Sequence, residues 1–495
     1  MPRARPKVVR LSLAKAPTGI QGLDEVTGGG LPKGRVTLVC GSAGCGKSLL
    51  AMEFLVHGAV QYGEPGVCMD FEETEEKLRA NVASLGFDLR ALAKHKKLLV
   101  DFVSIERNEI AETGEYNLDG LFIRLAHAVK AIKAKRVVLD SIEALFAGLT
   151  DSTMLRAELR RLFHWLEDHK LTAVVTGEAG EHTLTRHGLE EYIADCVIAL
   201  DHRVTEQIST RRLRVIKYRG TSHGTDEYPF LIDREGISVV PITSLALAHQ
   251  ASTDRVSTGI PALDEMMEGK GFFRGSSVLV SGTSGTGKSS LAANFARAAC
   301  ARGEVCLYFA FEESPSQILR NMRSVGLHLE PSVKKRLLHF HAMRPTSIGL
   351  EAHLAAVHKL IEKVRPSVVV IDPITNLVSI SGTYNVKSML MRLVDFLKVE
   401  QITSMFTNLT FAGDPQERTA AAVSSLMDTW IVLRDNKSNG RPRRELYVLK
   451  SRGMAHSREP RELIVSERGI ELGNVLRDHT LATTVAGPGS VAAAE

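Results

Sequence analysis

A phosphate-loop sequence occurs twice in this chain and constrains its fold more than any other feature. The copies are Gly41-Ser42-Ala43-Gly44-Cys45-Gly46-Lys47-Ser48 and Gly282-Thr283-Ser284-Gly285-Thr286-Gly287-Lys288-Ser289. In such a loop the glycines let backbone N–H groups close around a phosphate, the Lys reaches the outer phosphates, and the hydroxyl can hold Mg²⁺. Each copy follows an apolar run and opens a helix-like segment, which disfavours a Gly-rich turn without a ligand. We expect both loops to bind ATP and Mg²⁺.

Other short motifs return at a nearly constant spacing. Thr18-Gly19-Ile20 returns as Thr258-Gly259-Ile260, and Lys217-Tyr218-Arg219-Gly220 as Lys450-Ser451-Arg452-Gly453. The offset is about 230 to 240 residues throughout, which indicates a duplicated domain and not a single shared motif. Short apolar runs alternate with longer amphipathic segments, so each half is predicted to be α/β, a mostly parallel sheet flanked by helices.

Length and composition limit the number of domains and the class of protein. A chain of 495 residues indicates more than one domain. We expect a basic tail over 1–15, ATPase domains over 16–247 and 248–473, and a flexible tail over 474–495. No apolar run could span a bilayer, and six scattered cysteines fit a reducing cytoplasm without structural zinc. The net charge of +5 is mild and does not demand nucleic acid.

Two acidic pairs occupy matched positions, Glu72-Glu73 and Glu312-Glu313. Each pair is predicted to follow a strand that neighbours the phosphate-loop strand, at the sheet edge where ligands bind. A carboxylate there could orient or deprotonate a nucleophile that attacks the γ-phosphate. It could instead be a solvated carboxylate in a first helical turn. Recurrence favours a catalytic role for the first Glu of each pair, while the second could be a salt-bridge partner.

Asp140 and Asp372 each end a buried run of mostly β-branched residues. A Walker-B carboxylate would stand there and bind Mg²⁺ through water beside the loop hydroxyl of Ser48 or Ser289. Either Asp could instead cap the next helix. The phosphate loop upstream favours the metal role.

Basic residues alternate along one late strand in each half. Strand periodicity puts Lys217 with Arg219 on one face, and Lys450 with Arg452 on one face. Such cations could be merely solvated, but their repetition indicates a site for γ-phosphate charge. Because they lie far along the chain from their own loop, they could serve the nucleotide of a neighbouring subunit.

The halves differ just before these strands. The repeat aligns Glu191-Tyr192 with Ser424-Ser425, which places two hydroxyls where the first half has a carboxylate and a phenol. Paired serines on exposed helices are usually inert. A phosphate on this pair would add about −1.5 to −2 charges and could reset a subunit contact.

These motifs together resemble the KaiC family, the double-domain RecA-type ATPases of the bacterial circadian clock. The resemblance rests on both phosphate loops, the acidic pairs, Asp140-Ser141, Lys217-Tyr218-Arg219-Gly220-Thr221-Ser222-His223 and Ser424-Ser425, and it covers about residues 16–472. It implies two tandem RecA-like P-loop NTPase domains and a hexamer of two stacked rings with ATP at subunit interfaces.

The resemblance also implies roles for single residues. The first ring would hydrolyse ATP with Glu72 activating water, and the second would be a Ser/Thr autokinase and autophosphatase with Glu312 as general base. Phosphate would move to Ser424 and Ser425, with Thr419 as an auxiliary site. The residues implied to contact the ATP of the adjacent subunit are Lys217, Tyr218, Arg219, His223, Lys450, Arg452 and His456.

The chain departs from the family in three places. The phosphate-accepting pair is Ser-Ser where clock members have Ser-Thr, and the loops end in Ser48 and Ser289 where they often have Thr. The tail after Leu472 does not resemble the segment that binds the activator KaiA, which leaves regulation by KaiA doubtful. A KaiB-like partner on the first ring remains open.

Two other functions remain open. A DNA-dependent motor of the RecA or helicase kind would share the fold, but it needs aromatic and basic residues interleaved in DNA-binding loops, and aromatics are only 5% of the chain. A scaffold without autokinase activity would bind ATP only to hold subunits together.

Overall fold

The computed structural model describes residues 13–103, 118–146, 152–180, 183–186, 188, 190–205, 208–241, 251–344, 349–410, 425–438 and 441–476. Thr419, Ser424 and most of the two expected tails lie outside the described residues. The chain divides into two compact units, one of Met1–Ser244 with Glu351–Lys359, the other of Leu245–Leu350 with Leu360–Glu495.

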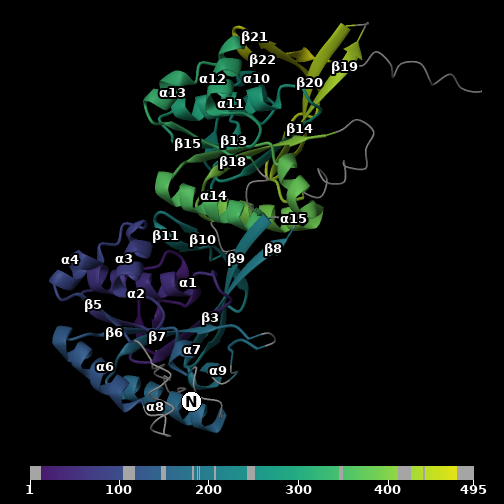
Figure 1. The fold of residues 1–495 in the computed structure, drawn as a ribbon. Coiled ribbons are helices and arrows are strands. Elements are labelled where there is room, and N and C mark those ends of the chain that lie inside the picture. Colours follow the sequence, from purple (N-terminus) through teal and green to yellow (C-terminus); the bar gives the residue numbers. More distant parts are fainter. Residues whose placement is uncertain are drawn as a thin grey trace, which may run out of the picture. The chain divides into compact units, whose positions relative to one another are not determined.

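The first unit alternates strands and helices (Figure 1). Its elements are β1 (Lys15–Ala16), α1 (Leu23–Val26), β2 (Leu31–Pro32), β3 (Val36–Gly41), α2 (Lys47–Gln61), β4 (Gly66–Asp70), α3 (Glu75–Ala83), α4 (Leu89–Lys94), β5 (Leu98–Phe102), α6 (Asp119–Ile132), β6 (Arg136–Asp140), α7 (Ile142–Leu145), α8 (Ser152–Asp168), β7 (Thr172–Glu178), α9 (Glu190–Ile193), β8 (Cys196–Thr205), β9 (Ile208–Tyr218), β10 (Glu227–Asp233) and β11 (Gly236–Val239). The main sheet has the order β11-β10-β9-β8-β3-β7-β6-β4-β5. Strands from β8 to β5 in that order pair in parallel, and β8 to β11 pair antiparallel.

The second unit repeats this plan. Its elements are β12 (Arg255–Val256), α10 (Pro261–Glu265), β13 (Phe272–Phe273), β14 (Ser277–Gly282), α11 (Lys288–Ala301), β15 (Cys306–Ala310), α12 (Pro315–Ser324), α13 (Glu330–Lys334), β16 (Leu338–Ala342), α14 (Leu350–Val364), β17 (Val368–Asp372), α15 (Thr375–Val399), β18 (Thr403–Leu409), β19 (Thr429–Ser438), β20 (Arg441–Ser451), β21 (Arg461–Ser466) and β22 (Gly469–Val475). The sheet order is β16-β15-β17-β18-β14-β19-β20-β21-β22, again parallel up to β19 and antiparallel beyond it. The predicted α/β fold with two mostly parallel, helix-flanked sheets is confirmed.

Successive side chains of a strand point to opposite sides of the sheet, so a mostly parallel sheet has two apolar faces that helices cover. In β3, Val39 packs into the core cluster that contains α2, whereas Leu38 packs into the cluster that contains α6 and α8. Figure 1 shows α2 on one face of this sheet and α6 and α8 on the other. Within the described part of the chain, no helix combines the length and the apolar character needed to cross a membrane.

The repeated Thr-Gly-Ile motif builds a turn at the start of each unit. The carboxylate of Asp24 accepts hydrogen bonds from the backbone N–H of Thr18 at 2.7 Å and of Gly19 at 3.0 Å. The carboxylate of Asp264 accepts from the N–H of Thr258 at 2.8 Å. This duplicated motif therefore stabilises the fold.

One expectation about strand order is wrong. The acidic pairs were predicted to follow strands adjacent to the phosphate-loop strands, but β7 and β6 lie between β3 and β4, and β18 and β17 lie between β14 and β15. The reason is that each crossover after β4 and β15 inserts a later strand nearer the loop, which chain order alone does not reveal. The acidic pairs still end at the same sheet edge as the loops, since all these strands are parallel.

Candidate functional site

The first phosphate loop joins β3 to α2. Gly44 and Gly46 have φ angles of 74° and 108°, a left-handed conformation that residues with a Cβ rarely adopt. Lys47 Nζ donates to the carbonyl oxygens of Gly41 at 2.8 Å and Ser42 at 3.1 Å. The loop thus holds its own ammonium group above the backbone, where an anion would be bound.

The second loop repeats this geometry between β14 and α11. Gly285 and Gly287 have φ angles of 81° and 102°. Lys288 Nζ donates to the carbonyls of Gly282 at 2.9 Å and Thr283 at 2.7 Å. Burial lowers the pKa of Lys288, and the carboxylates of Asp372 and Glu312 oppose this by raising it. The predicted Lys, Asp and Glu of the second site are therefore close in space.

The two predicted Walker-B carboxylates end β6 and β17. Asp140 is 7% exposed and accepts a hydrogen bond from the hydroxyl of Thr176, and the hydroxyl of Ser48 lies near enough to influence its pKa. Burial raises the pKa of Asp140, while those two hydroxyls and Lys47 lower it. The loop hydroxyl and this Asp are therefore near one another, as a shared cation site requires.

Asp372 has a related but different set of partners. It accepts hydrogen bonds from the hydroxyl of Thr407 and, at 2.6 Å, from the phenol of Tyr308. Thr176 and Thr407 were missed by the sequence reasoning. Both lie near the end of a buried strand, one strand beyond the Asp and at the spacing of the repeat, and that spacing could have revealed them.

The first Glu of each acidic pair is directed toward its Walker-B strand. Ser141 Oγ donates to Glu72 Oε1 at 2.8 Å, and Asn376 Nδ2 donates to Glu312 Oε1 at 3.1 Å. Glu72 is also close enough to raise the pKa of Asp140. Neither Ser141 nor Asn376 was expected to contact these carboxylates.

The second Glu of each pair contacts the following helix. Asn81 Nδ2 donates to Glu73 Oε2 at 2.9 Å, and Asn321 Nδ2 donates to both oxygens of Glu313 at 3.2 Å. In these contacts the partner of Glu73 and of Glu313 is a neutral amide, whereas the sequence allowed a salt-bridge partner for the second Glu.

The predicted cationic pairs lie at the ends of matched strands, and their two arginines contact matched carbonyls. Arg219 donates to the carbonyl of Tyr192 at 3.0 Å, and Arg452 donates to that of Ser425 at 2.8 Å. Lys217 Nζ also donates to the Tyr192 carbonyl, at 3.2 Å. The two equivalent arginines therefore bind the carbonyls of the two residues that the repeat aligns, Tyr192 and Ser425. Lys450 Nζ donates to the carbonyl of Met427 at 2.8 Å.

Burial lowers the pKa of Lys217 and Lys450, and in each case the neighbouring Arg lowers it further. Two cations that crowd one another in this way favour an anionic ligand between them.

Three further residues of these segments have distinct surroundings. Tyr218 is buried, and its hydroxyl donates to the carbonyl of Gly30 at 2.8 Å, so it points into its own unit. His223 Nδ1 and His456 Nε2 are buried nitrogens with no hydrogen-bond partner among the described residues. The two histidines occupy equivalent positions in the repeat, and within the described part of the chain Nδ1 is unpaired in one and Nε2 in the other.

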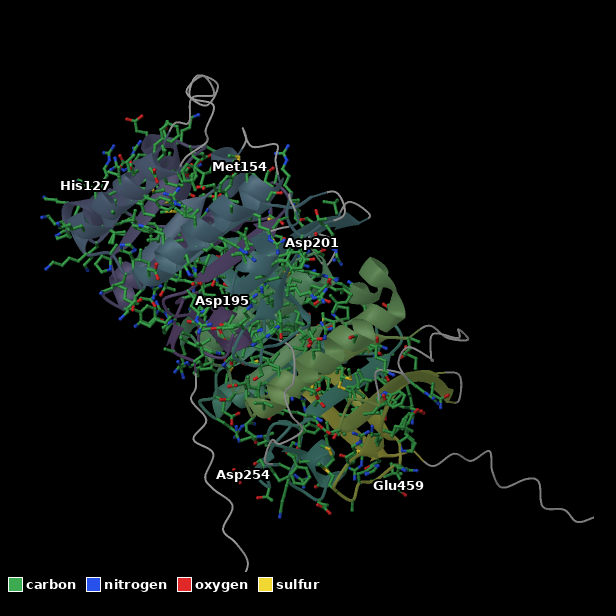
Figure 2. All side chains as sticks on the ribbon, turned by 90° about the horizontal axis from the view of Figure 1, so that it is seen from below. His127, Met154, Asp195, Asp201, Asp254 and Glu459 are labelled. Carbon is green, nitrogen blue, oxygen red and sulfur yellow. The ribbon has the colours of Figure 1, made fainter. Side chains whose placement is uncertain are left out.

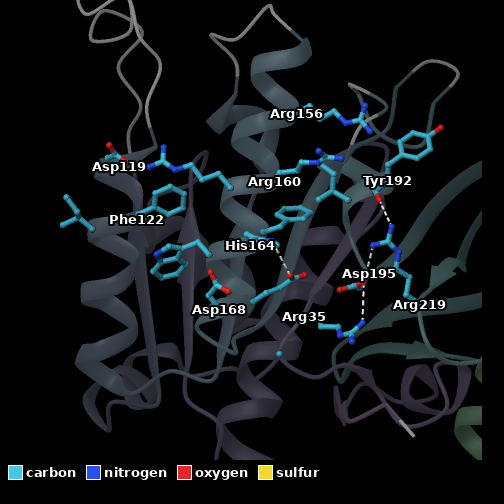
Figure 3. A pocket seen from close by; sticks show the side chains of 17 residues that line it. Arg35, Asp119, Phe122, Arg156, Arg160, His164, Asp168, Tyr192, Asp195 and Arg219 are labelled. Carbon is cyan, nitrogen blue, oxygen red and sulfur yellow. Dashed lines mark hydrogen bonds and ion pairs between the residues drawn. The ribbon is translucent and has the colours of Figure 1, made fainter. Parts of the chain in front are cut away.

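A pocket of about 1460 Å³ opens on the face that carries Arg219 (Figure 3). Arg35 and Arg219 flank Asp195 at 3.6 Å and 3.5 Å, and Arg156, Arg160 and the 66%-exposed Tyr192 complete its basic side. Asp195 is also labelled among the side chains of Figure 2. No phosphate-loop residue lines this pocket, so it belongs to a different face from the loop of the same unit.

The residues present fit a nucleoside triphosphate with a divalent cation. Each unit offers a Gly-rich turn with a Lys above it and a carboxylate close to that Lys. The loop part of the predicted site is thus present in both units.

Comparison with known proteins gives a consistent result. The family model described as the KaiC ATPase matches residues 16–244 and again 256–476. The chain is 55% identical over 464 residues to circadian clock protein KaiC2 of Synechocystis, covering 93% of this chain and 82% of the relative. It is 36% identical over 471 residues to circadian clock oscillator protein KaiC of Parathermosynechococcus lividus (94% and 87% covered). For that of Synechococcus elongatus the identity is 35% over 471 residues (94% and 90% covered).

Proposed function

Because the chain belongs to the KaiC family, we propose that it works as a homohexamer that binds ATP and Mg²⁺ at its subunit interfaces. Family membership makes it a KaiC-like ATPase and autokinase that binds nucleotide in both repeats. The proposed domains are 16–247 and 248–473. The observation that carries the proposal is the duplicated Lys, Asp and Glu constellation, with Lys47, Asp140 and Glu72 in one unit and Lys288, Asp372 and Glu312 in the other.

In the first site, Glu72 takes the proton of the water that attacks the γ-phosphate. Ser141 holds the carboxylate by its 2.8 Å hydrogen bond, so that one oxygen is fixed and the other is available. Lys47 exchanges its two loop carbonyls for phosphate oxygens and keeps its charge there. Ser48 and Asp140 would hold Mg²⁺, which supplies charge neutralisation on the phosphates.

In the second site, Glu312 takes the proton of a serine hydroxyl instead of water. The phosphoryl group passes from ATP to that oxygen, the bond to the β-phosphate breaks, and ADP leaves. Ser424 and Ser425 are the proposed acceptors, with Thr419 as an auxiliary one. Arg452 binds the backbone carbonyl of Ser425, which ties the acceptor segment to the cationic strand.

The basic strands complete the site of the adjacent subunit in this proposal. Lys217, Arg219 and His223 would meet the triphosphate of a neighbour in the first ring, and Lys450, Arg452 and His456 in the second. Support comes from the pocket that Arg219 lines together with four other arginines and four acidic residues, and that no residue of the phosphate loop lines. Tyr218 would act through the packing of its strand, because its hydroxyl is bound to Gly30. Family membership alone supports a KaiB-like partner on the first ring.

Phosphate release by the full-length protein tests the proposal. Glu72→Gln combined with Glu312→Gln should lower the rate by about 10²-fold or more, since each change removes a proton acceptor. An unchanged rate would overturn the assignment of both carboxylates. Hydrolysis that depends on added DNA, with salt-dependent DNA binding, would favour the motor alternative.

A further inference from the structure

Asp70, the last residue of β4, has no assigned role in the reaction. It is 3% exposed, and its Oδ1 accepts hydrogen bonds from the backbone N–H of Glu72 at 2.9 Å and of Glu73 at 2.7 Å. One carboxylate oxygen thus closes the turn that carries the proposed proton acceptor.

The second unit builds the same turn with another residue. The N–H of Phe71 donates to the Asp140 carbonyl at 2.7 Å, and the N–H of Phe311 donates to the Asp372 carbonyl at 2.9 Å. At the position of Asp70, however, the second unit has Ala310, whose methyl group cannot accept a hydrogen bond. The fold therefore does not need a carboxylate at this position.

A carboxylate here is also costly to bury. In the parallel register of β4 and β6, Asp70 lies beside Asp140. The pKa of Asp70 is raised to about 6, mainly by burial and also by Asp140 and Glu73, although the two backbone N–H groups lower it. Ala310 avoids this cost in an equivalent turn. A functional requirement of the first site therefore explains the presence of Asp70 better than a contribution to stability does.

We propose that Asp70 is a positioning residue of the first site, which fixes the backbone of Glu72 so that its side chain meets the attacking water. Two restraints then act on Glu72: Oδ1 of Asp70 holds its main chain, and Ser141 holds its carboxylate. The second site lacks the first restraint at Ala310, and its Glu312 is left to accommodate a serine hydroxyl that arrives on a chain segment. The inference rests on the proposed function of Glu72.

The test uses the full-length protein in a Glu312→Gln background, so that the first site dominates phosphate release. Asp70→Ala should lower kcat about ten-fold while KM for ATP changes less than two-fold, since misplacement of a catalytic group acts on the chemical step. Asp70→Asn keeps an oxygen at the position of Oδ1 and should restore kcat to within about three-fold of the parent. A residue with only a structural role would change KM and kcat together.

Glu72→Gln in the same background measures the share of turnover that depends on Glu72. If this variant keeps full activity, the proposed role of Glu72 is wrong, and the positioning role of Asp70 is then wrong as well. If Glu72→Gln is inactive but Asp70→Ala keeps the parental kcat, only the inference on Asp70 is overturned. An Asp70→Asn variant as slow as Asp70→Ala would also overturn it. If Asp70→Ala fails to fold, Asp70→Val, which fills the same space without an acceptor, takes its place with the same expected loss of kcat, and a parental kcat would overturn the inference.

Discussion

The two nucleotide sites share their scaffold and differ in the side chains that surround the acidic groups. Both place a Lys above a Gly-rich loop and an Asp at the end of the strand that pairs with the Glu strand. Around that common core, the first site has Asp70 and Ser141 where the second has Ala310 and Pro373. The duplicated fold therefore preserves what binds a triphosphate, while neighbouring residues set what each carboxylate can do.

The partners of the two Walker-B carboxylates differ in the same way. Asp140 accepts from the hydroxyl of Thr176 and lies near that of Ser48, whereas Asp372 accepts from the phenol of Tyr308 in addition to the hydroxyl of Thr407. The position of Tyr308 is occupied by Cys68 in the first unit, where a thiol cannot reach as far. The two sites are thus predicted to respond differently to equivalent substitutions.

The largest effect is expected from the arginines that we propose to contact the nucleotide of a neighbouring subunit. Arg219→Ala should slow the first site and Arg452→Ala the second, each by about 10³-fold, as for an arginine that stabilises phosphoryl transfer in trans. Phosphate release and serine phosphorylation, measured separately, would report the two sites.

Mixed assemblies distinguish action in trans from a local defect. Subunits with Arg452→Ala, mixed with subunits with Lys288→Ala, form some interfaces in which both groups are intact, so part of the activity should return. A mixture that stays inactive would contradict completion of the site by a neighbour.

A smaller effect is expected from the side chains that contact the catalytic carboxylates. Ser141→Ala should lower hydrolysis at the first site about ten-fold and leave serine phosphorylation unchanged, because it frees only Glu72. Asn376→Ala should do the reverse through Glu312. If either variant affects both activities equally, the two sites are not controlled independently by these contacts.

The smallest effect on catalysis is expected at Glu53, whose influence is on stability. This residue of α2 is 1% exposed, and its carboxylate accepts from the N–H of Ile237 at 2.8 Å. Burial raises its pKa from 4.5 to about 8, the Ile237 N–H lowers it, and Asp233 raises it. The folded unit therefore binds this proton more tightly than the unfolded chain, so stability is full below about pH 4.5 and is lost as the pH rises toward 8.

Glu53→Gln should remove this dependence and stabilise the first unit by roughly 1–3 kcal/mol at pH 8, with unchanged ATP hydrolysis. The second unit is the natural control, since its equivalent residue Asn294 is already a neutral amide. The chain has two tryptophans, Trp165 in the first unit and Trp430 in the second. Unfolding followed by fluorescence in a Trp430→Phe background would report the first unit, and an unchanged pH profile would contradict the prediction.

Features within one strand–loop–helix unit could be predicted from the sequence. The loops, the helices that follow them and the Asp at the strand end follow from local sequence patterns. Each pattern occurs twice at the spacing of the repeat, which strengthened the prediction. The order of strands could not be predicted, because a crossover can return on either side of its parent strand. The Glu strand was therefore placed beside the loop strand, when two strands lie between them.

The contacts that distinguish the two sites depend on that order. Ser141 reaches Glu72 and Thr176 reaches Asp140 across neighbouring strands, so neither contact follows from sequence spacing alone. Asp70 could have been noticed as the one charged residue in an otherwise apolar strand. Its partners, the N–H groups of the next turn, become evident only with the backbone in place.

Phosphopeptide mapping after incubation with ATP and Mg²⁺ tests most directly whether one fold performs two chemistries. The parent protein should carry phosphate at Ser424 or Ser425, Glu312→Gln should carry none, and Glu72→Gln should still be phosphorylated while its ATP hydrolysis falls. Phosphate absent from both serines of the parent, or retained in Glu312→Gln, would contradict the account.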